Sequence, residues 1–215
     1  MARKRETFFD GERMSGRTDN GLVRIVLDTS VFTNPDSSSQ WGKSSMESIR
    51  LFLEQARAAR ERVAFFMPHS VYEELNTYLS NETIPPEFEI LVSLQSPNRY
   101  GIMVPGFLLY ELIEDIRERI NKGLRVAEKA VREAQAEHME KSITRLREKY
   151  RAALREGILD SREDADLVLL AMEREAALVS SDRGVTRWAE KAGVRLIDPL
   201  KLRSILEELS EGESQ

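Results

Sequence analysis

Residues 22–28 read LVRIVLD, a mostly apolar and β-branched run that stops at a carboxylate. The six residues Leu22–Leu27 suit a buried strand by length and by residue type. The pattern therefore predicts a strand that delivers Asp28 at its carboxyl end. Ligands of open α/β sheets bind beyond the carboxyl ends of the strands, so Asp28 is the first candidate for a functional residue.

The alternation of strands and helices continues along the chain. Further strands are predicted over residues 63–67, 102–104, 177–180 and 194–197. Helices are predicted over residues 46–59, 68–79, 88–94, 166–176, 185–192 and 199–209, and a polar loop around residues 34–39. Strands that alternate with helices form parallel sheets, so we expect an α/β fold with three layers and a parallel central sheet.

A long helical segment interrupts this alternation. Apolar residues keep helical spacing from Phe107 to Gly123, which is predicted to cap or bend the helix. A second helical run, from Leu124 to Leu154, follows and ends at Gly157. If it were straight, it would be roughly 45 Å long at 1.5 Å per residue, so we expect a helical hairpin that protrudes from the core.

These patterns divide the chain into five segments. They are a flexible extension (1–21), a first part of the core (22–104), a helical insertion that serves as an RNA-binding arm (105–157), a second part of the core (158–210) and a tail (211–215).

Composition limits the chemistry that this chain of 215 residues can carry. It has no cysteine and only two histidines, so thiolate and imidazole sites are disfavoured and any metal should be held by oxygen. No stretch approaches the roughly 18 to 20 apolar residues of a membrane span, and the amino terminus does not resemble a secretory signal. We therefore expect a cytoplasmic protein.

The charge is segregated along the sequence. The formal net charge is −5, but residues 117–155 contain twelve Lys and Arg against six Glu, so this segment carries about +6 and the rest about −11. Because Lys and Arg dominate phosphate binding, the helical arm is the predicted RNA-binding element. Its candidate contacts are Arg125, Lys129, Arg132, Lys141, Arg145 and Arg147.

Acidic residues gather at the predicted strand ends. Asp182 follows the strand over residues 177–180, much as Asp28 follows the first strand. In the stretch ILDSREDADL, Ser161 is a predicted helix N-cap, with Asp164 three residues later. Asp160 and Asp164 are four residues apart, a spacing that stacks side chains on one face of a helix.

Several carboxylates in one cleft repel each other unless a cation offsets their charge, so the pattern favours a divalent metal, Mg²⁺ or Mn²⁺. In a two-metal site the ions activate water and stabilise the leaving oxygen of a phosphodiester, without a nucleophilic side chain. The predicted catalytic residues and metal ligands are Asp28, Asp160, Asp164 and Asp182, with Glu74 and Asp166 as weaker metal candidates.

Structural explanations exist for each of these residues taken singly. An Asp after a strand is often a turn or cap residue, Asp164 and Ser161 can serve only as a cap, and Asp166 can simply offset the helix dipole. The basic arm can likewise be an ordinary solvated helix surface. Two strand-end aspartates together with a pair four residues apart are a more specific signal than any one of them.

Three long motifs carry a family resemblance. They are LDTSVFTNP at Asp28, ILDSREDADLVLLAMEREAALVSSDRGV through Asp182, and the closing WAEKAGVRLIDP. With YEEL at Glu74, they resemble the PIN-domain nucleases. The basic helical pair between them makes the chain more similar to the minimal protein-only RNase P family, homologues of Aquifex RNase P (HARP), also called RNA ligase partner proteins.

The resemblance implies an enzyme that removes the 5′ leader of precursor tRNA without an RNA subunit. It implies catalysis by Asp28, Asp160, Asp164 and Asp182 with Mg²⁺ or Mn²⁺, and dimers that assemble into large rings. It also implies that the protruding helices grip the tRNA elbow. The family core does not require the extension before Leu22, which leaves Met14 as an alternative start.

Two other functions fit the same residues. A toxin-like PIN ribonuclease would use the same carboxylates on other RNA. A non-catalytic RNA-binding partner or scaffold of an RNA-processing enzyme would use the arm alone, although retention of four aspartates argues against it.

Overall fold

Five parallel strands form one sheet, in the order β3-β2-β1-β4-β5. The computed structural model describes residues 21–80, 82–133, 139–155, 159 and 161–211. The strands are β1 (Val23–Leu27), β2 (Val63–Met67), β3 (Val92–Leu94), β4 (Ala177–Val179) and β5 (Leu196–Ile197). The prediction of an α/β fold with a parallel central sheet is confirmed.

Strand β1 lies at the centre of the sheet, between the two halves of the chain. From β1 the chain builds β2 and β3 on one side, and later returns to add β4 and β5 on the other. Val26 pairs with Phe66 of β2 and with Leu178 of β4. The order of strands reverses between β1 and β4, which makes the carboxyl ends of these two strands the expected place for a ligand.

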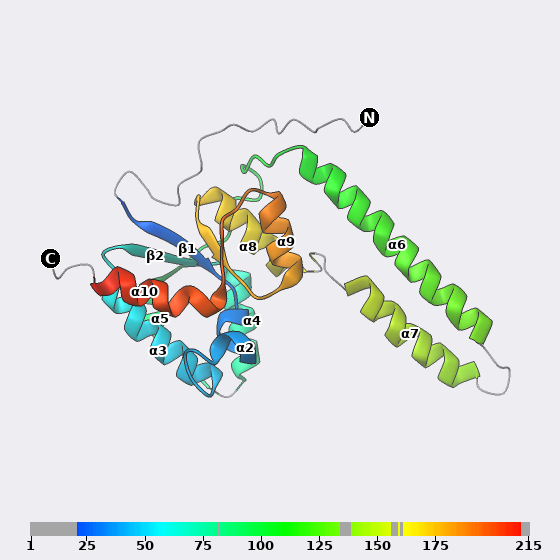
Figure 1. Cartoon of the computed structure of the whole chain (residues 1–215), viewed down its shortest axis with the longest axis horizontal. Coiled ribbons are helices and arrows are strands. Elements are labelled where there is room, and N and C mark those ends of the chain that lie inside the picture. The colour runs from blue at the N-terminus through cyan, green and yellow to red at the C-terminus, as the bar shows by residue number, and fades with distance from the viewer. Residues whose placement is uncertain (1–20, 81, 134–138, 156–158, 160, 212–215) are drawn as a thin grey trace, which may run out of the picture.

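Helices cover both faces of the sheet (Figure 1). Helices α3 and α10 contact each other on one face, and α8 contacts α9, α4 and strand β1 on the other. The helices of the core are α1 (Ser30–Thr33), α2 (Pro35–Ser38), α3 (Ser45–Ala58), α4 (His69–Leu79), α5 (Glu87–Leu91), α8 (Arg162–Glu173), α9 (Arg183–Lys191) and α10 (Leu202–Glu211), with a 3-10 helix η2 (Pro199–Lys201).

Aromatic side chains fill the layer between the sheet and α3. Phe52 of α3 makes edge-on contacts with Phe32, Trp41 and Phe65, at ring-centroid distances of 5.3, 5.8 and 5.1 Å. All four rings are buried. Burying one large apolar side chain contributes roughly 1.5–3 kcal/mol, so this cluster fixes the segment that follows β1 against the sheet.

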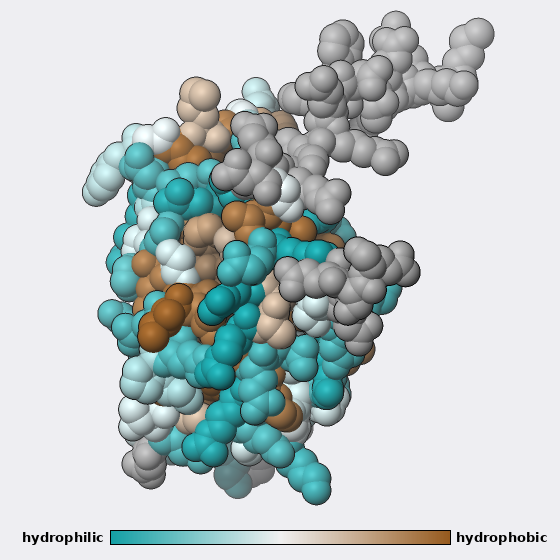
Figure 2. Space-filling model, turned by 90° about the vertical axis from the view of Figure 1, so that its left-hand side faces the viewer, coloured by the Kyte–Doolittle hydropathy of each residue, from teal (hydrophilic) through white to brown (hydrophobic). Residues whose placement is uncertain are grey.

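The surface of the core differs from its interior. Figure 2 views the end of the molecule away from α6 and α7 and shows mostly hydrophilic residues, with hydrophobic ones in small areas. Among the described residues, no helix combines the length and the apolar composition needed to cross a membrane.

Three predictions for the first half of the core are wrong in detail. The polar stretch at residues 34–39 forms helix α2, capped by the Asn34 side chain, which accepts from the Asp36 N–H. Residues 88–94 divide into α5 and β3, because pairing of Val92–Leu94 with β2 overrides the helical spacing. Residues 102–104 form no strand, and Met103 there is 91% exposed.

The helical insertion is a pair of helices, α6 (Phe107–Glu133) and α7 (Met139–Arg155), which lie side by side next to the core (Figure 1). The predicted bend at Gly123 is wrong, since α6 continues through it, and the single long run from 124 to 154 is two helices. A Cβ at Gly123 would lie 2.7 Å from Cε2 of Tyr150. This glycine therefore serves the close approach of α6 and α7, not the end of a helix.

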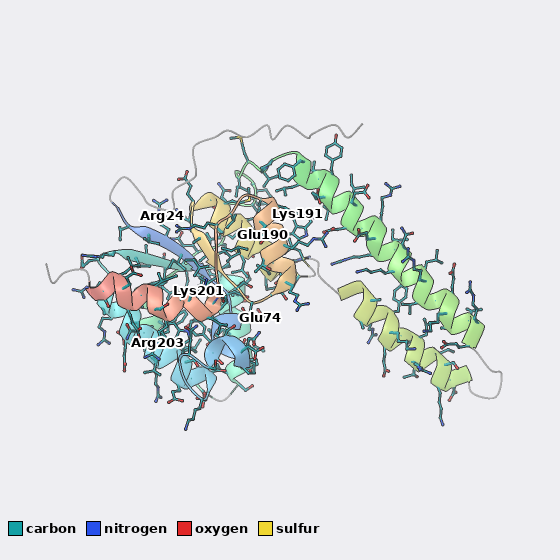
Figure 3. The ribbon with its side chains drawn as sticks, viewed as in Figure 1. Arg24, Glu74, Glu190, Lys191, Lys201 and Arg203 are labelled. Carbon is teal, nitrogen blue, oxygen red and sulfur yellow. The ribbon has the colours of Figure 1, made fainter. Side chains whose placement is uncertain are left out.

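Helix α6 is fastened to the core by a buried carboxylate. Asp115 is 2% exposed and accepts a hydrogen bond from Trp188 Nε1 at 3.0 Å. Its other oxygen lies 3.4 Å from Arg187 and 3.7 Å from Lys191, both on α9. Lys191 also pairs with Glu111 at 2.6 Å and lies on α9 close to α6 (Figure 3).

Removing this carboxylate should loosen α6 from α9. We expect Asp115→Ala to lower the free energy of unfolding by about 2 kcal/mol, because it leaves a buried indole N–H without its acceptor and removes a buried carboxylate from beside Arg187 and Lys191. Chemical denaturation followed by tryptophan fluorescence measures the loss. The control is Glu114→Ala, which removes an exposed carboxylate next to it. Equal stability of the two variants would contradict this role of Asp115.

Candidate functional site

Asp28 stands at the carboxyl end of β1, where the order of strands reverses. Its backbone N–H donates to the carbonyl of Val179 at 3.1 Å, which continues the pairing of β1 with β4. The residue is only 6% exposed. The hydroxyls of Ser30 and Ser180 both donate to Oδ2 at 2.6 Å, while the bond that Oδ1 accepts from the Thr29 hydroxyl is long, at 3.3 Å. Oδ2 is therefore held in place by two hydroxyls, and Oδ1 can still accept a further hydrogen bond or bind a cation.

The surroundings of Asp28 disfavour its negative charge. Burial raises the pKa of this carboxyl above its ordinary value, and the negative charge of Asp182 raises it further, against the lowering effect of the two serine hydroxyls. In the described part of the chain, no Lys or Arg lies within 4.0 Å of the carboxylate of Asp28 or Asp182. As far as the described residues go, Asp28 and Asp182 thus have no Lys or Arg as counterion.

Asp182 caps the helix that follows β4. One of its carboxylate oxygens, Oδ1, accepts from the N–H groups of Gly184 and Val185 at 2.6 and 2.9 Å. Its own N–H donates to the Ser180 hydroxyl at 3.0 Å, and that hydroxyl donates in turn to Asp28. Oδ1 of Asp182 is therefore anchored, while Oδ2 has no hydrogen bond to a described residue.

Two glutamates, Glu74 and Glu163, join Asp28 and Asp182 in an acidic cluster. Burial raises the pKa of Glu74, and the negative charges of Asp28 and Glu163 raise it further. Glu74 lies on α4, at the end of the sheet where β1 ends (Figure 3). Glu74 is therefore close enough to Asp28 for their charges to interact, and Glu163 in the first turn of α8 is an addition that was not predicted from the sequence.

Asp164 lies in the first turn of α8, a helix that contacts both β1 and α9. The predicted cap is confirmed, since the Ser161 hydroxyl accepts from the Asp164 N–H at 3.0 Å. Helix α8 begins at Arg162, after its N-cap Ser161, so the predicted stacking on Asp164 depends on where Asp160 lies. Asp160 itself lies outside the described residues.

Asp166 is occupied by other partners. It is 2% exposed, and its two oxygens accept from Nε and Nη2 of Arg99 at 3.0 and 2.5 Å. Oδ2 also accepts from the Ser70 hydroxyl at 2.8 Å. These bonds join α4, α8 and the loop after β3. They favour a structural role for Asp166, or a role outside the direct ligands of a metal, over direct binding of the metal.

The sequence analysis missed the hydroxyl groups that hold the aspartates. Ser30 donates to Asp28 and accepts from the Ser181 N–H at 3.0 Å, and Asn34 donates to the Ser181 hydroxyl at 2.9 Å. Their signal was the serine two residues after Asp28 and the pair of serines directly before Asp182. Short hydroxyl side chains beside a strand-end aspartate are typical of local hydrogen-bonded turns.

Known proteins share this chain's pattern. The family model described as "PINc domain ribonuclease" matches residues 24–211. Proteins named "RNA-free ribonuclease P" are 45% identical in Pyrococcus abyssi over 192 residues (88% of this chain, 94% of the relative) and 46% identical in Nitrosococcus oceani over 193 residues (88% and 96%). The relative of that name in Halorhodospira halophila is 48% identical over 191 residues (88% and 92%).

The chain belongs to the RNA-free ribonuclease P family of PIN-domain ribonucleases. This confirms the resemblance seen in the sequence. PIN nucleases generally use divalent metal ions.

The carboxylates of this PIN domain fit such an ion. Asp28 is buried with a raised pKa, no Lys or Arg of the described ranges pairs with it, and Asp28 and Asp182 each keep one oxygen with few hydrogen bonds. Oxygen ligands of this kind are those that Mg²⁺ and Mn²⁺ prefer. Within the described residues, which leave out Asp160, no three Asp, Glu or His side chains are close enough to hold one ion.

The raised pKa of Asp28 gives a pH dependence that can be measured without metal. A carboxyl whose pKa is raised by folding contributes stability that is fully present below its unfolded pKa and is lost as the pH rises through the folded value. We expect metal-free Asp28→Asn to have a higher melting temperature than the wild type at pH 7, with the difference shrinking toward pH 4.

The control is Asp36→Asn, which changes an exposed acid in the first turn of α2 and should follow the wild type at each pH. Mg²⁺ or Mn²⁺ should raise the melting temperature of the wild type more than that of Asp28→Asn. Parallel curves for Asp28→Asn and the wild type would show that Asp28 is not held as described.

Proposed function

We propose that this protein removes the 5′ leader from precursor tRNA by hydrolysing one phosphodiester with Mg²⁺ or Mn²⁺, and that it needs no RNA subunit. The supporting observation is the pair of strand-end aspartates, Asp28 and Asp182, joined through the Ser180 hydroxyl at the point where the strand order reverses. The relatives that share most of the chain's length carry the name RNA-free ribonuclease P.

The protein's own residues supply position and charge. Ser30 and Ser180 orient Asp28, the amino terminus of α9 orients Asp182, and Ser161 fixes the turn that carries Asp164. Bound divalent ions would supply an activated water and would stabilise the leaving oxygen, giving a 5′-phosphate on the tRNA and a 3′-hydroxyl on the leader. Asp28, Asp160, Asp164 and Asp182 would hold them, with Glu74 at the edge of the cluster.

The arm supplies a surface for the RNA backbone. All six residues predicted to bind RNA are exposed on α6 or α7: Arg125, Lys129, Arg132, Lys141, Arg145 and Arg147. A cleft of about 410 Å³ between the two helices is lined by Lys129, Arg145 and Lys149. Because side chains cannot read bases inside an RNA duplex, such a surface suits recognition of tRNA by its shape and phosphates.

A second feature of α6 supports assembly of the protein with itself. Exposed apolar side chains recur at helical spacing along α6, and they are Leu109, Leu112, Ile113, Ile116, Ile120 and Leu124, each 42–61% exposed. Soluble proteins rarely leave so continuous an apolar stripe uncovered. We infer that a second copy of this chain covers it, as the first step toward the larger ring that the resemblance implies.

The cleavage site can be tested one carboxylate at a time. We expect Asp164→Asn to keep the fold and to lower cleavage of a precursor tRNA by more than about a hundredfold, because it weakens a ligand of the divalent ion. Single-turnover cleavage with and without Mg²⁺, with mapping of the new 5′ ends, measures this loss.

Glu73→Gln is the matched control, because Glu73 is an exposed acid next to Glu74. Unchanged activity of Asp164→Asn would remove this assignment. Absence of metal-dependent turnover in the wild type would favour the non-catalytic alternative, and cleavage of unrelated structured RNA at equal rates would favour the toxin-like one.

The arm can be tested separately from the chemistry. Charge reversal at Arg125, Arg132 and Arg145 should weaken binding of precursor tRNA and flatten its dependence on salt, because fewer counterions are released. Binding titrations at several salt concentrations, with Glu118→Lys and Glu128→Lys as opposite changes on the same helix, measure the effect. Unchanged affinity would make the arm an assembly element only.

A further inference from the structure

The loop after β3 contains a turn that is tightly fixed to α8. The N–H of Asn98 donates to Glu173 at 2.7 Å, and the Asn98 side chain accepts from the Gly101 N–H at 3.1 Å. A Cβ at residue 101 would lie 2.4 Å from Nδ2 of Asn98, so a larger residue there would displace the Asn98 side chain that closes the turn. The two residues between these anchors are Arg99 and Tyr100.

One edge of the Arg99 guanidinium is hydrogen-bonded to the protein, and the other edge has no partner among the described residues. Its Nε and Nη2 donate to the two oxygens of Asp166, and Asp166 is fixed from the other side by Ser70. Nη1 has no partner among the described residues, and the Arg99 side chain is 53% exposed. A guanidinium that is fixed in this way presents its remaining donors to solvent in a constant direction, as phosphate recognition requires.

This guanidinium lies at the border of the acidic cluster. Ser70, which donates to Asp166, is one helical turn before Glu74 on the same side of α4. The negative charge of Glu163 acts on both Arg99 and Glu74. Any strand that enters the cluster to be cut would therefore pass close to Arg99.

Tyr100 adds an aromatic ring to the same place. It is fully exposed, at 103% of the reference area, and its hydroxyl is close enough to Arg99 to affect the pKa of the guanidinium. An exposed ring on a fixed turn beside a cation is the combination that holds unpaired nucleotides, because the base stacks on the ring and the phosphate meets the cation.

We propose that Arg99 and Tyr100 form a subsite for an unpaired nucleotide of the substrate next to the cut, with the base on Tyr100 and a phosphate on Nη1 of Arg99. Asp166 and Ser70 are then positioning residues for Arg99. The subsite rests on the proposed function. A precursor tRNA offers unpaired nucleotides near its cleavage point from two sources, the 5′ leader and the 3′ tail.

The test compares Tyr100→Ala with the wild type on three substrates: a precursor with a leader of several nucleotides and an intact 3′ tail, one with a single-nucleotide leader, and one without the tail. On the full substrate, Tyr100→Ala should raise the half-saturating enzyme concentration about tenfold in single-turnover assays. The difference from the wild type should disappear on whichever shortened substrate lacks the stacked nucleotide, which identifies the source.

Three further variants separate the subsite from folding. Tyr100→Phe should behave as the wild type, since it keeps the ring, and Tyr110→Ala removes an exposed tyrosine of α6 as a matched control. Arg99→Lys keeps the charge beside Asp166 but loses the fork of donors, so it should weaken binding of the same substrates as Tyr100→Ala.

Two results would overturn the subsite. One is an unchanged half-saturating concentration for both Tyr100→Ala and Arg99→Lys on the full substrate, and a smaller assembly in light scattering would then assign the turn to contacts between copies of the chain. The other is an equal loss on all three substrates. Lack of cleavage by the wild type is a different outcome, since it removes the proposed function and the subsite with it.

Discussion

A buried carboxylate that has no counterion among the residues the structure describes is the constraint around which the end of the sheet is built. Asp28 is almost inaccessible, yet the groups that reach it are hydroxyls and other acids, so its charge is tolerated only partly. Two serine hydroxyls stabilise one oxygen, which lessens the cost of burial without neutralising the charge. The folded protein therefore keeps negative charge at this site that is not neutralised. A divalent ion bound with the RNA substrate would neutralise it.

The topology of the sheet creates this site. Asp28 and Asp182 are far apart in sequence, but β1 and β4 are neighbours, and both strands end at the point where the chain changes direction across the sheet. Ser180 connects the two, since its hydroxyl donates to Asp28 and accepts from the N–H of Asp182. A shift of β4 by one residue would turn Ser180 to the other face and break both bonds, so the strand register and the geometry of the acids are set together.

The parts of the molecule that were predictable are those with a strong local signal. The strands that carry Asp28 and Asp182 are continuous apolar runs, and the cap at Ser161 has its own sequence signature, so their positions followed from the sequence. The strand β3 did not, because a short apolar run fits a helix as well and only pairing with β2 decides. Gly123 was misread for a related reason: its contact with Tyr150 comes from a helix that is distant in sequence. The hydroxyls around Asp28 could not be predicted either, because sequence periodicity does not show which serines meet across the sheet.

Helix α9 connects the arm to the acidic cluster. Helix α9 begins at its cap Asp182 and, within its nine residues, presents Trp188 and Lys191 to Asp115 and Glu111 of α6. One short helix therefore contacts the acidic cluster at its amino end and the arm further along. A nine-residue helix spans roughly 13 Å and does not bend easily, so the distance from arm to cluster is held by backbone hydrogen bonds and a buried carboxylate. An enzyme that selects its cleavage point by the shape of the RNA needs such a fixed distance, because slack of one nucleotide's length between the two contacts would allow cleavage at a neighbouring phosphate.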